Sequence, residues 1–139
     1  AYTLECWVRP TVAGKAMNIV VRSDDSYPLA AWSHQLRINA DGKFEHYCEA
    51  SGAEGVEKYT VTHTLTAVAG NWYHVAATAA GNGDKRLYVD GSEEGTAVSV
   101  GGALRGKIDR YFIGSETGDG MGRLEGKIAE VRLWISAQD

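Results

Sequence analysis

The feature of this sequence that most constrains its fold is the alternation of apolar and polar residues within short segments. In YTLECWVRP, residues 2–10, the alternate positions Tyr2, Leu4, Cys6 and Val8 suit a core. KYTVTHTLT, residues 58–66, alternates in the same way, with one lysine and four threonines on the outward side. Successive side chains of a β-strand point to opposite faces, so these patterns predict strands with one buried face. Apolar positions at helical spacing are not sustained anywhere, so the predicted fold class is all-β.

Short glycine-bearing stretches separate the predicted strands. Ala40, Asp41 and Gly42 fit a three-residue hairpin loop with glycine in the left-handed conformation. Pairing Asn39 with Lys43 across this loop gives one face its apolar side chains, which are Leu36, Ile38, Phe44 and Cys48. Asp90-Gly91 predicts a second tight turn, after core residues Leu87 and Val89. About ten short strands divided in this way predict an antiparallel two-sheet β-sandwich of the jelly-roll type.

Length and charge narrow the class of protein. The chain has 139 residues, which suits one domain with a hydrophobic core. Its formal net charge of −4 argues against nucleic acid or an anionic membrane as a partner. No apolar run approaches the ~20 residues that span a bilayer, so we expect no membrane insertion. Strand-like sequence begins at residue 2 and ends near residue 139. We therefore expect residues 1–139 to be one domain cut from a larger multidomain chain.

The two cysteines alternate with residues of the predicted core. Cys6 shares a face with Leu4 and Val8, and Cys48 shares one with Phe44. A disulfide and two buried free thiols both fit these positions. The four histidines also lie within predicted strands: His34, His46, His63 and His74. Zinc would need three or four converging ligands, and hydrogen-bonded histidines inside the fold are the better prediction.

Two acidic stretches are candidate metal sites. RSDDSY and GSETGDG supply four carboxylates, which are Asp24, Asp25, Glu116 and Asp119. Calcium takes six to eight oxygen ligands, often from loops, and two loops at one rim of a sandwich could provide them. The alternative is that these are solvated turn residues, since Asp, Ser and Gly favour turns.

A third candidate set is aromatic. Sugar rings have apolar C–H faces that pair with exposed aromatic rings, and the residues considered are Tyr27, Trp32, Tyr47 and Tyr59. Aromatic residues in strands also serve as core or cross-strand partners, which is the competing interpretation. Trp32 falls on the side of Leu36 and Ile38, which favours burial. Acid and nucleophile carboxylates at glycosidase spacing are not evident, so we expect no enzyme activity and no catalytic residues.

Three segments together identify a family. YTLECWVRP, GNWYHVAATAAGNGDKRLYVDG and FIGSETGDGMGRLEGKIAEVRLWISAQD resemble the laminin-G-like and pentraxin-like jelly rolls of the concanavalin A-like lectin/glucanase superfamily, in the same order. Such domains usually begin with an additional strand before the position of Tyr2, which is absent here. The resemblance assigns GNWYHVAATAAGNGDKRLYVDG to the scaffold. It also implies calcium ligands in loops that match Asp24, Asp25, Glu116 and Asp119.

The resemblance implies a non-catalytic binding or adhesion module. Its expected location is extracellular or at the cell surface, and its expected partner is a glycan or an extracellular protein, with calcium as the candidate cofactor. A structural spacer or protein-interaction domain is the alternative, and a glycoside hydrolase has less support. A fold of this kind hosts many ligands, so the site decides the function.

Overall fold

The computed structural model describes residues 1–23, 34–52, 55–80, 84–93, 98–99, 110–115 and 122–135. Every regular element in these ranges is a β-strand. The strands are β1 (Tyr2–Pro10), β2 (Met17–Ser23), β3 (His34–Ile38), β4 (Lys43–Gly52), β5 (Gly55–Thr66), β6 (Tyr73–Ala79), β7 (Asp84–Val89), β8 (Ser92–Glu93), β9 (Val98–Ser99), β10 (Arg110–Ile113) and β11 (Gly126–Trp134). The all-β prediction is confirmed. Within the described ranges there is no helix with the length and hydropathy needed to cross a membrane.

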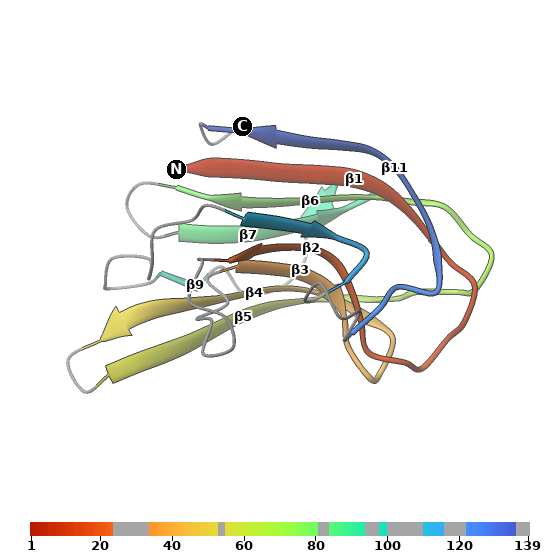
Figure 1. Cartoon of the computed structure of the whole chain (residues 1–139), viewed down its shortest axis with the longest axis horizontal. Coiled ribbons are helices and arrows are strands. Elements are labelled where there is room, and N and C mark those ends of the chain that lie inside the picture. The colour runs from red at the N-terminus through yellow and green to blue at the C-terminus, as the bar shows by residue number, and fades with distance from the viewer. Residues whose placement is uncertain are drawn as a thin grey trace.

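The strands form two antiparallel sheets. Sheet A has the order β11-β1-β6-β7-β8, with β9 also paired to β7, and sheet B has the order β10-β2-β3-β4-β5. The first and last strands are therefore neighbours, and the start of β1 lies at the same end of the molecule as the end of β11 (Figure 1). The turns after β1, β3 and β5 lie at the opposite end (Figure 1). Backbone hydrogen bonds from Gly70 to Pro10 and from Ala67 to Gly42 connect these turns.

The core lies between the inner faces of the two sheets. From sheet A it receives the predicted alternate residues of β1, and from sheet B it receives Leu36, Ile38 and Phe44, all almost completely buried. Leu87 and Val89 of β7 join them. The large side chains at alternate positions of the two facing sheets fill the space between them and exclude water from it. This agrees with the two-residue alternation of the sequence.

Both predicted hairpin turns are present. Gly42 has φ of 78° and the N–H of Asn39 bonds the carbonyl of Lys43, as expected for the Ala40–Gly42 loop. At the second turn, Asp90 and Gly91 have φ of 51° and 79°. Two consecutive left-handed residues are typical of the two-residue turn whose twist matches that of the flanking strands. Glycine is needed at Gly42 because side chains rarely adopt such a backbone.

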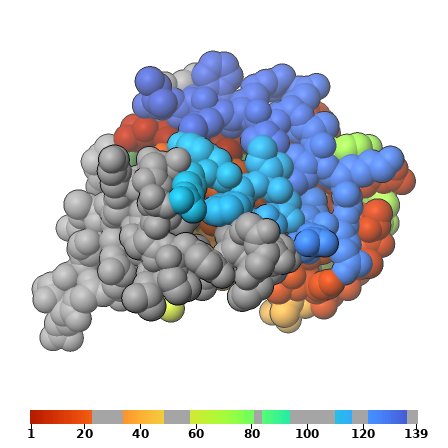
Figure 2. Space-filling view, viewed as in Figure 1, coloured from red at the N-terminus to blue at the C-terminus, as the bar shows by residue number. Residues whose placement is uncertain are grey.

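Strands β10 and β11 lie beside each other at one edge of the sandwich. Figure 2 shows the residues of β10 next to the segment that contains β11. The N–H of Leu124 bonds the carbonyl of Gly114, and the N–H of Gly114 bonds the carbonyl of Ile19 in β2. Sequence segments far apart thus meet where the two sheets approach.

The cysteines are free thiols. Cys6 lies in sheet A and Cys48 in sheet B, both completely buried. This settles the two alternatives that the sequence left open in favour of buried thiols. Burial raises the pKa of the Cys6 thiol to about 12, since the interior disfavours the thiolate, and Glu5 adds to this effect.

Candidate functional site

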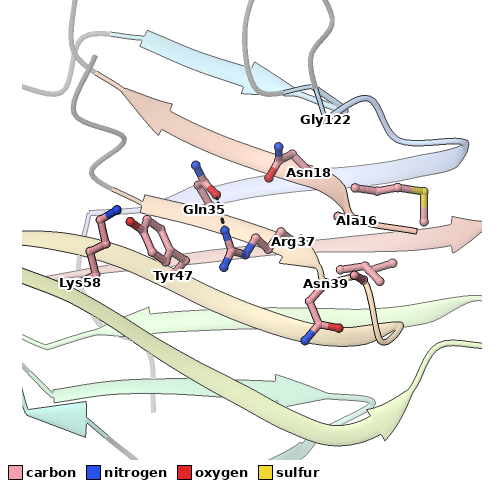
Figure 3. A pocket seen from close by; sticks show the side chains of 11 residues that line it. Ala16, Asn18, Gln35, Arg37, Asn39, Tyr47, Lys58 and Gly122 are labelled. Carbon is pink, nitrogen blue, oxygen red and sulfur yellow. Dashed lines mark hydrogen bonds between the residues drawn. The ribbon is translucent and has the colours of Figure 1, made fainter. Parts of the chain in front are cut away.

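A cleft of about 470 Å³ opens on the outer face of sheet B. Strands β2, β3, β4 and β5 all contribute to it, and its lining is Ala16, Met17, Asn18, Gln35, Arg37, Ile38, Asn39, Ala40, Tyr47, Lys58 and Gly122. Figure 3 shows the side chains of Gln35, Arg37, Tyr47 and Lys58 on one side of the sheet. A cleft of this size with a few convergent polar groups is typical of a small-ligand site.

Strand alternation explains why these side chains meet. Leu36 and Ile38 point into the core, so Gln35 and Arg37 must point outward. In the β3–β4 register, Gln35 lies opposite Tyr47, and Arg37 lies opposite Glu45. Directly opposite side chains of an antiparallel pair are close enough to interact, so the register itself builds this part of the cleft.

Arg37 is held by three neighbours. Its Nε donates to Oε2 of Glu45 at 2.9 Å, and its Nη1 donates to Oε1 of Gln35 at 3.1 Å. The guanidinium carbon lies 4.6 Å from the centre of the Tyr47 ring. Nη2 hydrogen-bonds no residue that the structure describes. Arg37 therefore presents a donor to a ligand from a position that its neighbours fix in advance.

Glu45 serves as the support for Arg37. Its second oxygen, Oε1, accepts hydrogen bonds from Nδ2 of Asn39 at 2.8 Å and from Oγ1 of Thr62 at 3.2 Å. Only 7% of Glu45 is exposed. Both oxygens of this carboxylate are hydrogen-bonded, and its burial keeps a substrate from reaching it. It is therefore suited to positioning a cation and poorly suited to transferring protons to a substrate.

The charges of the cleft are unequal. Among the described lining residues, Arg37 and the exposed Lys58 are cationic and none is acidic, while Glu45 lies behind the lining as the carboxylate that bonds Arg37 and Asn39. The described lining thus carries two cations and no carboxylate, although the whole chain carries −4. An excess of one sign in a cleft favours ligands of the other sign.

The predicted aromatic residues divide between the two faces. Tyr47 is on the outer face, where it lines the cleft, although it is only 8% exposed. Tyr59 pairs with Cys48, and its ring lies 5.4 Å from Nζ of the buried Lys85, so it faces the interior. The sugar-stacking hypothesis is wrong for Tyr59, because a side chain one position away from Lys58 points to the opposite face. Tyr27 and Trp32 lie outside the described residues.

The predicted calcium ligands, which are Asp24, Asp25, Glu116 and Asp119, also lie outside the described residues. The strands that lead to them are described. Ser23 pairs with Arg110, at the start of β10, whereas Gly114 bonds Ile19 at the other end of the same strand pair. Chain segments that follow Ser23 and Ser115 therefore leave β2 and β10 at opposite ends. Among the described residues, no three His, Cys, Asp or Glu side chains form a group that could hold a metal.

A hydrogen-bonded cluster lies in the interior. The Tyr2 hydroxyl is 2.5 Å from Nδ1 of His34 and 2.8 Å from Nε2 of His46. Because this hydroxyl has one hydrogen, it donates to one ring and accepts from the other. Burial lowers the pKa of His34 to about 2 and that of His46 to about 3, with nearby cations adding to the effect. Both rings are neutral near pH 7, as the prediction of hydrogen-bonded histidines requires.

Two further ionisable groups and one histidine complete the interior. Burial raises the pKa of Tyr2 well above its ordinary value, and Arg22, whose guanidinium lies 4.3 Å from the Tyr2 ring, partly opposes this. Burial lowers the pKa of Lys85 to about 8. His63 accepts from the N–H of Leu65 through Nδ1, at 3.0 Å, and donates through Nε2 to the carbonyl of Ser92, at 3.2 Å. These groups are enclosed by the sandwich and do not line the cleft.

Comparisons with known proteins place the chain in a family. A family model described as the concanavalin A-like lectin/glucanases superfamily (Laminin_G_3) matches residues 1–138. The chain belongs to this superfamily. The resemblance identified from the strand motifs is therefore confirmed, as is the jelly-roll fold class. Among functionally curated proteins, no sequence matches significantly.

Three solved structures share the fold at low sequence identity. The CBM40 module of the Ruminococcus gnavus IT-sialidase, bound to α2,3-sialyllactose, has a TM-score of 0.78 at 14% identity, covering 99% of this chain and 77% of its own. Domain 4 of AbnA, a GH43 extracellular arabinanase of Geobacillus stearothermophilus in complex with arabinotriose, has a TM-score of 0.73 at 19% identity, covering 99% and 62%. A Bacteroides ovatus protein assigned as carbohydrate-binding has a TM-score of 0.67 at 21% identity, covering 99% and 38%.

Sequence reasoning found Tyr47 and missed the rest of the cleft. Gln35, Arg37 and Lys58 occupy outward positions of strands that the sequence predicted correctly, so the alternation did carry their direction. The alternation does not predict which outward residues of different strands lie opposite each other in the sheet. That information comes from register and strand order.

Proposed function

We propose that this domain is a non-catalytic glycan-binding module, and that the cleft on sheet B is its binding site. The observation that carries the proposal is Arg37, a cation fixed by Glu45, Gln35 and Tyr47 with one nitrogen left for a ligand. Glycans present hydroxyl and carboxylate oxygens, which guanidinium groups bind well because their donors are planar and fixed.

The positive surplus of the cleft favours glycans that carry a carboxylate. Such a group would pair with Arg37, and Lys58 is a second cation on the same side of the sheet, beyond Tyr47 (Figure 3). Two of the structural neighbours were solved with an oligosaccharide, and one of these sugars is sialylated. They support a glycan as the ligand class, while the choice of an acidic glycan depends on the charges of this chain.

Titration calorimetry with α2,3-sialyllactose and with lactose tests this function. We expect the sialylated sugar to bind and lactose to bind at least about tenfold more weakly, because one charge-assisted pair contributes about 1.5 kcal/mol or more. Arg37→Met should remove this preference. Lys43→Met, on the same strand pair but outside the cleft lining, is the matched control and should keep it. Equal affinity of the wild-type protein for both sugars would contradict the acidic-glycan assignment.

Calcium dependence and an extracellular location are further parts of the proposal. Asp24, Asp25, Glu116 and Asp119 remain the proposed ligands, although the premise that both loops leave the sandwich at one rim is not supported, because β2 and β10 end at opposite ends of their strand pair. An extracellular location is supported by one structural neighbour, which belongs to an extracellular arabinanase. The domain is proposed to be one part of a multidomain chain, as it spans 38% to 77% of the neighbours compared.

One observation favours an interaction domain as the second candidate. Exposed apolar side chains gather on the edge strands β10 and β11 and just after β11, and they are Tyr111, Ile113, Leu133, Trp134 and Ile135. Apolar surface collected at one edge is typical of a contact with another protein or domain. In the calorimetric test, no binding of either sugar would favour this candidate over the glycan-binding module.

A further inference from the structure

A second cleft lies on the opposite side of the sandwich, on the outer face of sheet A. Its volume is about 350 Å³, and it is lined by Trp7, Trp72, Ala129 and Glu130. Both indoles are substantially exposed, Trp7 to 37% and Trp72 to 42%. Large aromatic side chains gain considerable free energy on burial, so two of them left open beside one cleft indicate a ligand surface.

One indole is carried by a strand and the other by the residue that precedes one. Trp7 lies in the middle of β1, which is paired on one side with β6 and on the other with β11. Its ring centre is 5.2 Å from that of His74. Trp72 directly precedes Tyr73, which is buried and whose hydroxyl accepts a hydrogen bond from the N–H of Val68 at 2.8 Å. The buried neighbours of both tryptophans fix the backbone that carries the indoles before a ligand binds, which favours affinity.

A β-bulge shapes the other wall. The β1–β11 register shifts between Glu5 and Trp7, so that one extra residue of β11 lies opposite β1. Within this bulge Glu130 has φ of 52°, the left-handed conformation that a side chain rarely adopts. Opposite Trp7 stands Ala129, whose short side chain leaves space beside the indole. Bulges often redirect side chains next to binding sites, and this one brings a carboxylate to the tryptophans.

The charges around this cleft are paired. Oε2 of Glu130 accepts a hydrogen bond from Nη2 of Arg132 at 2.6 Å, and Nη1 of Arg132 is 3.3 Å from Oε1 of Glu5. Glu5 also lies 3.5 Å from Nε2 of His74. Because Glu5 and Glu130 are both paired with Arg132, we expect the cleft to bind a free cation or anion only weakly. It retains oxygens and N–H groups that can exchange hydrogen bonds with hydroxyls.

We propose that this Trp7–Trp72 cleft binds a neutral oligosaccharide, whose sugar rings stack on the indoles while their hydroxyls hydrogen-bond the Glu130–Arg132 pair. A cleft of this volume fits one or two sugar units. The site is separate from the sheet B cleft, so the domain would bind two glycan segments on opposite faces.

Fluorescence titration and calorimetry with arabinotriose, xylohexaose, cellohexaose, laminarihexaose and mannohexaose test the proposal. At least one of these probes should bind the wild-type protein and change its tryptophan emission. Trp7→Ala and Trp72→Ala should each weaken that binding by about tenfold or more, because each removes a stacking partner. Ala129→Leu should block it without removing any ring, by filling the space beside Trp7.

Two control variants distinguish binding in this cleft from binding elsewhere on the domain. Tyr111→Ala removes an exposed aromatic side chain from β10 of sheet B, outside the cleft lining, and it should bind the neutral probe like the wild-type protein. Arg37→Met should also leave this binding intact, even though it abolishes the preference for sialyllactose. Unfolding curves of each variant show whether it is folded, and Trp72→Phe replaces Trp72→Ala if the latter is not.

Three results would overturn the proposal. One is that no neutral probe binds the wild-type protein at millimolar concentration. Another is that binding persists in both Trp72→Ala and Ala129→Leu. The third is that sedimentation velocity finds a dimer that Trp72→Ala dissociates, which would assign the face to contact between copies of this chain.

Discussion

Replacing Lys85 by methionine is expected to stabilise the fold. Lys85 is 1% exposed, and its side chain lies between the sheets, where Nζ donates to Sγ of Cys48 and lies 5.4 Å from the Tyr59 ring centre. Neither contact supplies an opposite charge. Methionine has nearly the same length and volume as lysine, so Lys85→Met removes the buried ammonium group with little change in packing.

The expected size of the effect follows from the lowered pKa. Lys85 falls from an ordinary pKa of 10.5 to about 8 because burial disfavours its charged form. One pKa unit corresponds to about 1.4 kcal/mol, so the charged lysine lowers the free energy of unfolding by up to about 3 kcal/mol. Between pH 8 and 10.5 the unfolded chain binds the proton and the folded chain does not. The wild-type contribution of Lys85 therefore rises with pH through that window, and is lowest below pH 8.

Urea unfolding of the wild-type protein and of Lys85→Met, near neutral pH and at pH 10.5, measures this directly. We expect the variant to be more stable near neutral pH, with a difference that shrinks as the pH rises. The Cys6 thiol, with its pKa raised to about 12, destabilises the fold as pH rises above 9, but equally in both proteins. Lys127→Met removes an exposed lysine and should show no such pH-dependent difference. A difference independent of pH, or a variant less stable than the wild type near neutral pH, would refute the reasoning.

Two more predictions concern pH and calcium. Because burial lowers the pKa of His34 to about 2 and of His46 to about 3, the unfolded chain binds two protons below about pH 6.5 that the folded chain does not. Stability should therefore fall by up to about 3 kcal/mol per pH unit below that value, whereas His34→Gln/His46→Gln should show a shallower fall in urea unfolding. Calcium should raise the melting temperature and chelator should reverse it, since a ligand that binds only the folded state stabilises it. If one ion uses all the proposed ligands, Asp24→Asn/Asp25→Asn and Glu116→Gln/Asp119→Asn should each abolish the shift; no shift in the wild-type protein would contradict calcium binding.

Most of the scaffold could be predicted because its determinants are local. The alternation of β1 gave its bounds directly, and the loop around Gly42 gave the β3–β4 register. The bulge in β11 could not be predicted in this way. Nothing in GKIAEVRLW marks Glu130 as left-handed, since glutamate has no preference for that conformation. The bulge exists because β11 must follow β1 on one side while its apolar residues stay over the core.

The binding surfaces were harder to predict because they combine residues from several strands. Tyr47 was considered as a sugar platform, but Arg37, which makes the cleft chemically useful, was not, since a lone arginine in a strand reads as an ordinary exposed residue. The sequence predicted a strand around Trp7 and placed Trp72 in a segment with a structural role. Only the pairing of β1 with β6 brings the two residues together. Residues far apart in the sequence can be neighbours in a sheet, and only the strand order shows which ones are.

Alternation along the strands also explains how one thin sandwich could hold two binding faces without losing stability. Arg37 stands between Leu36 and Ile38, which are both completely enclosed, so the core fixes the backbone that carries it. Trp7 stands between Cys6 and Val8 in the same relation. The buried neighbours of each outward residue fix the backbone, and the backbone fixes the position of the outward residue. Substitution of Trp7 should therefore change ligand affinity with little effect on unfolding, whereas changes to its inward neighbours Cys6 and Val8 should do the reverse. Substitution of Arg37 should also lower stability, because it leaves the buried Glu45 without its cation.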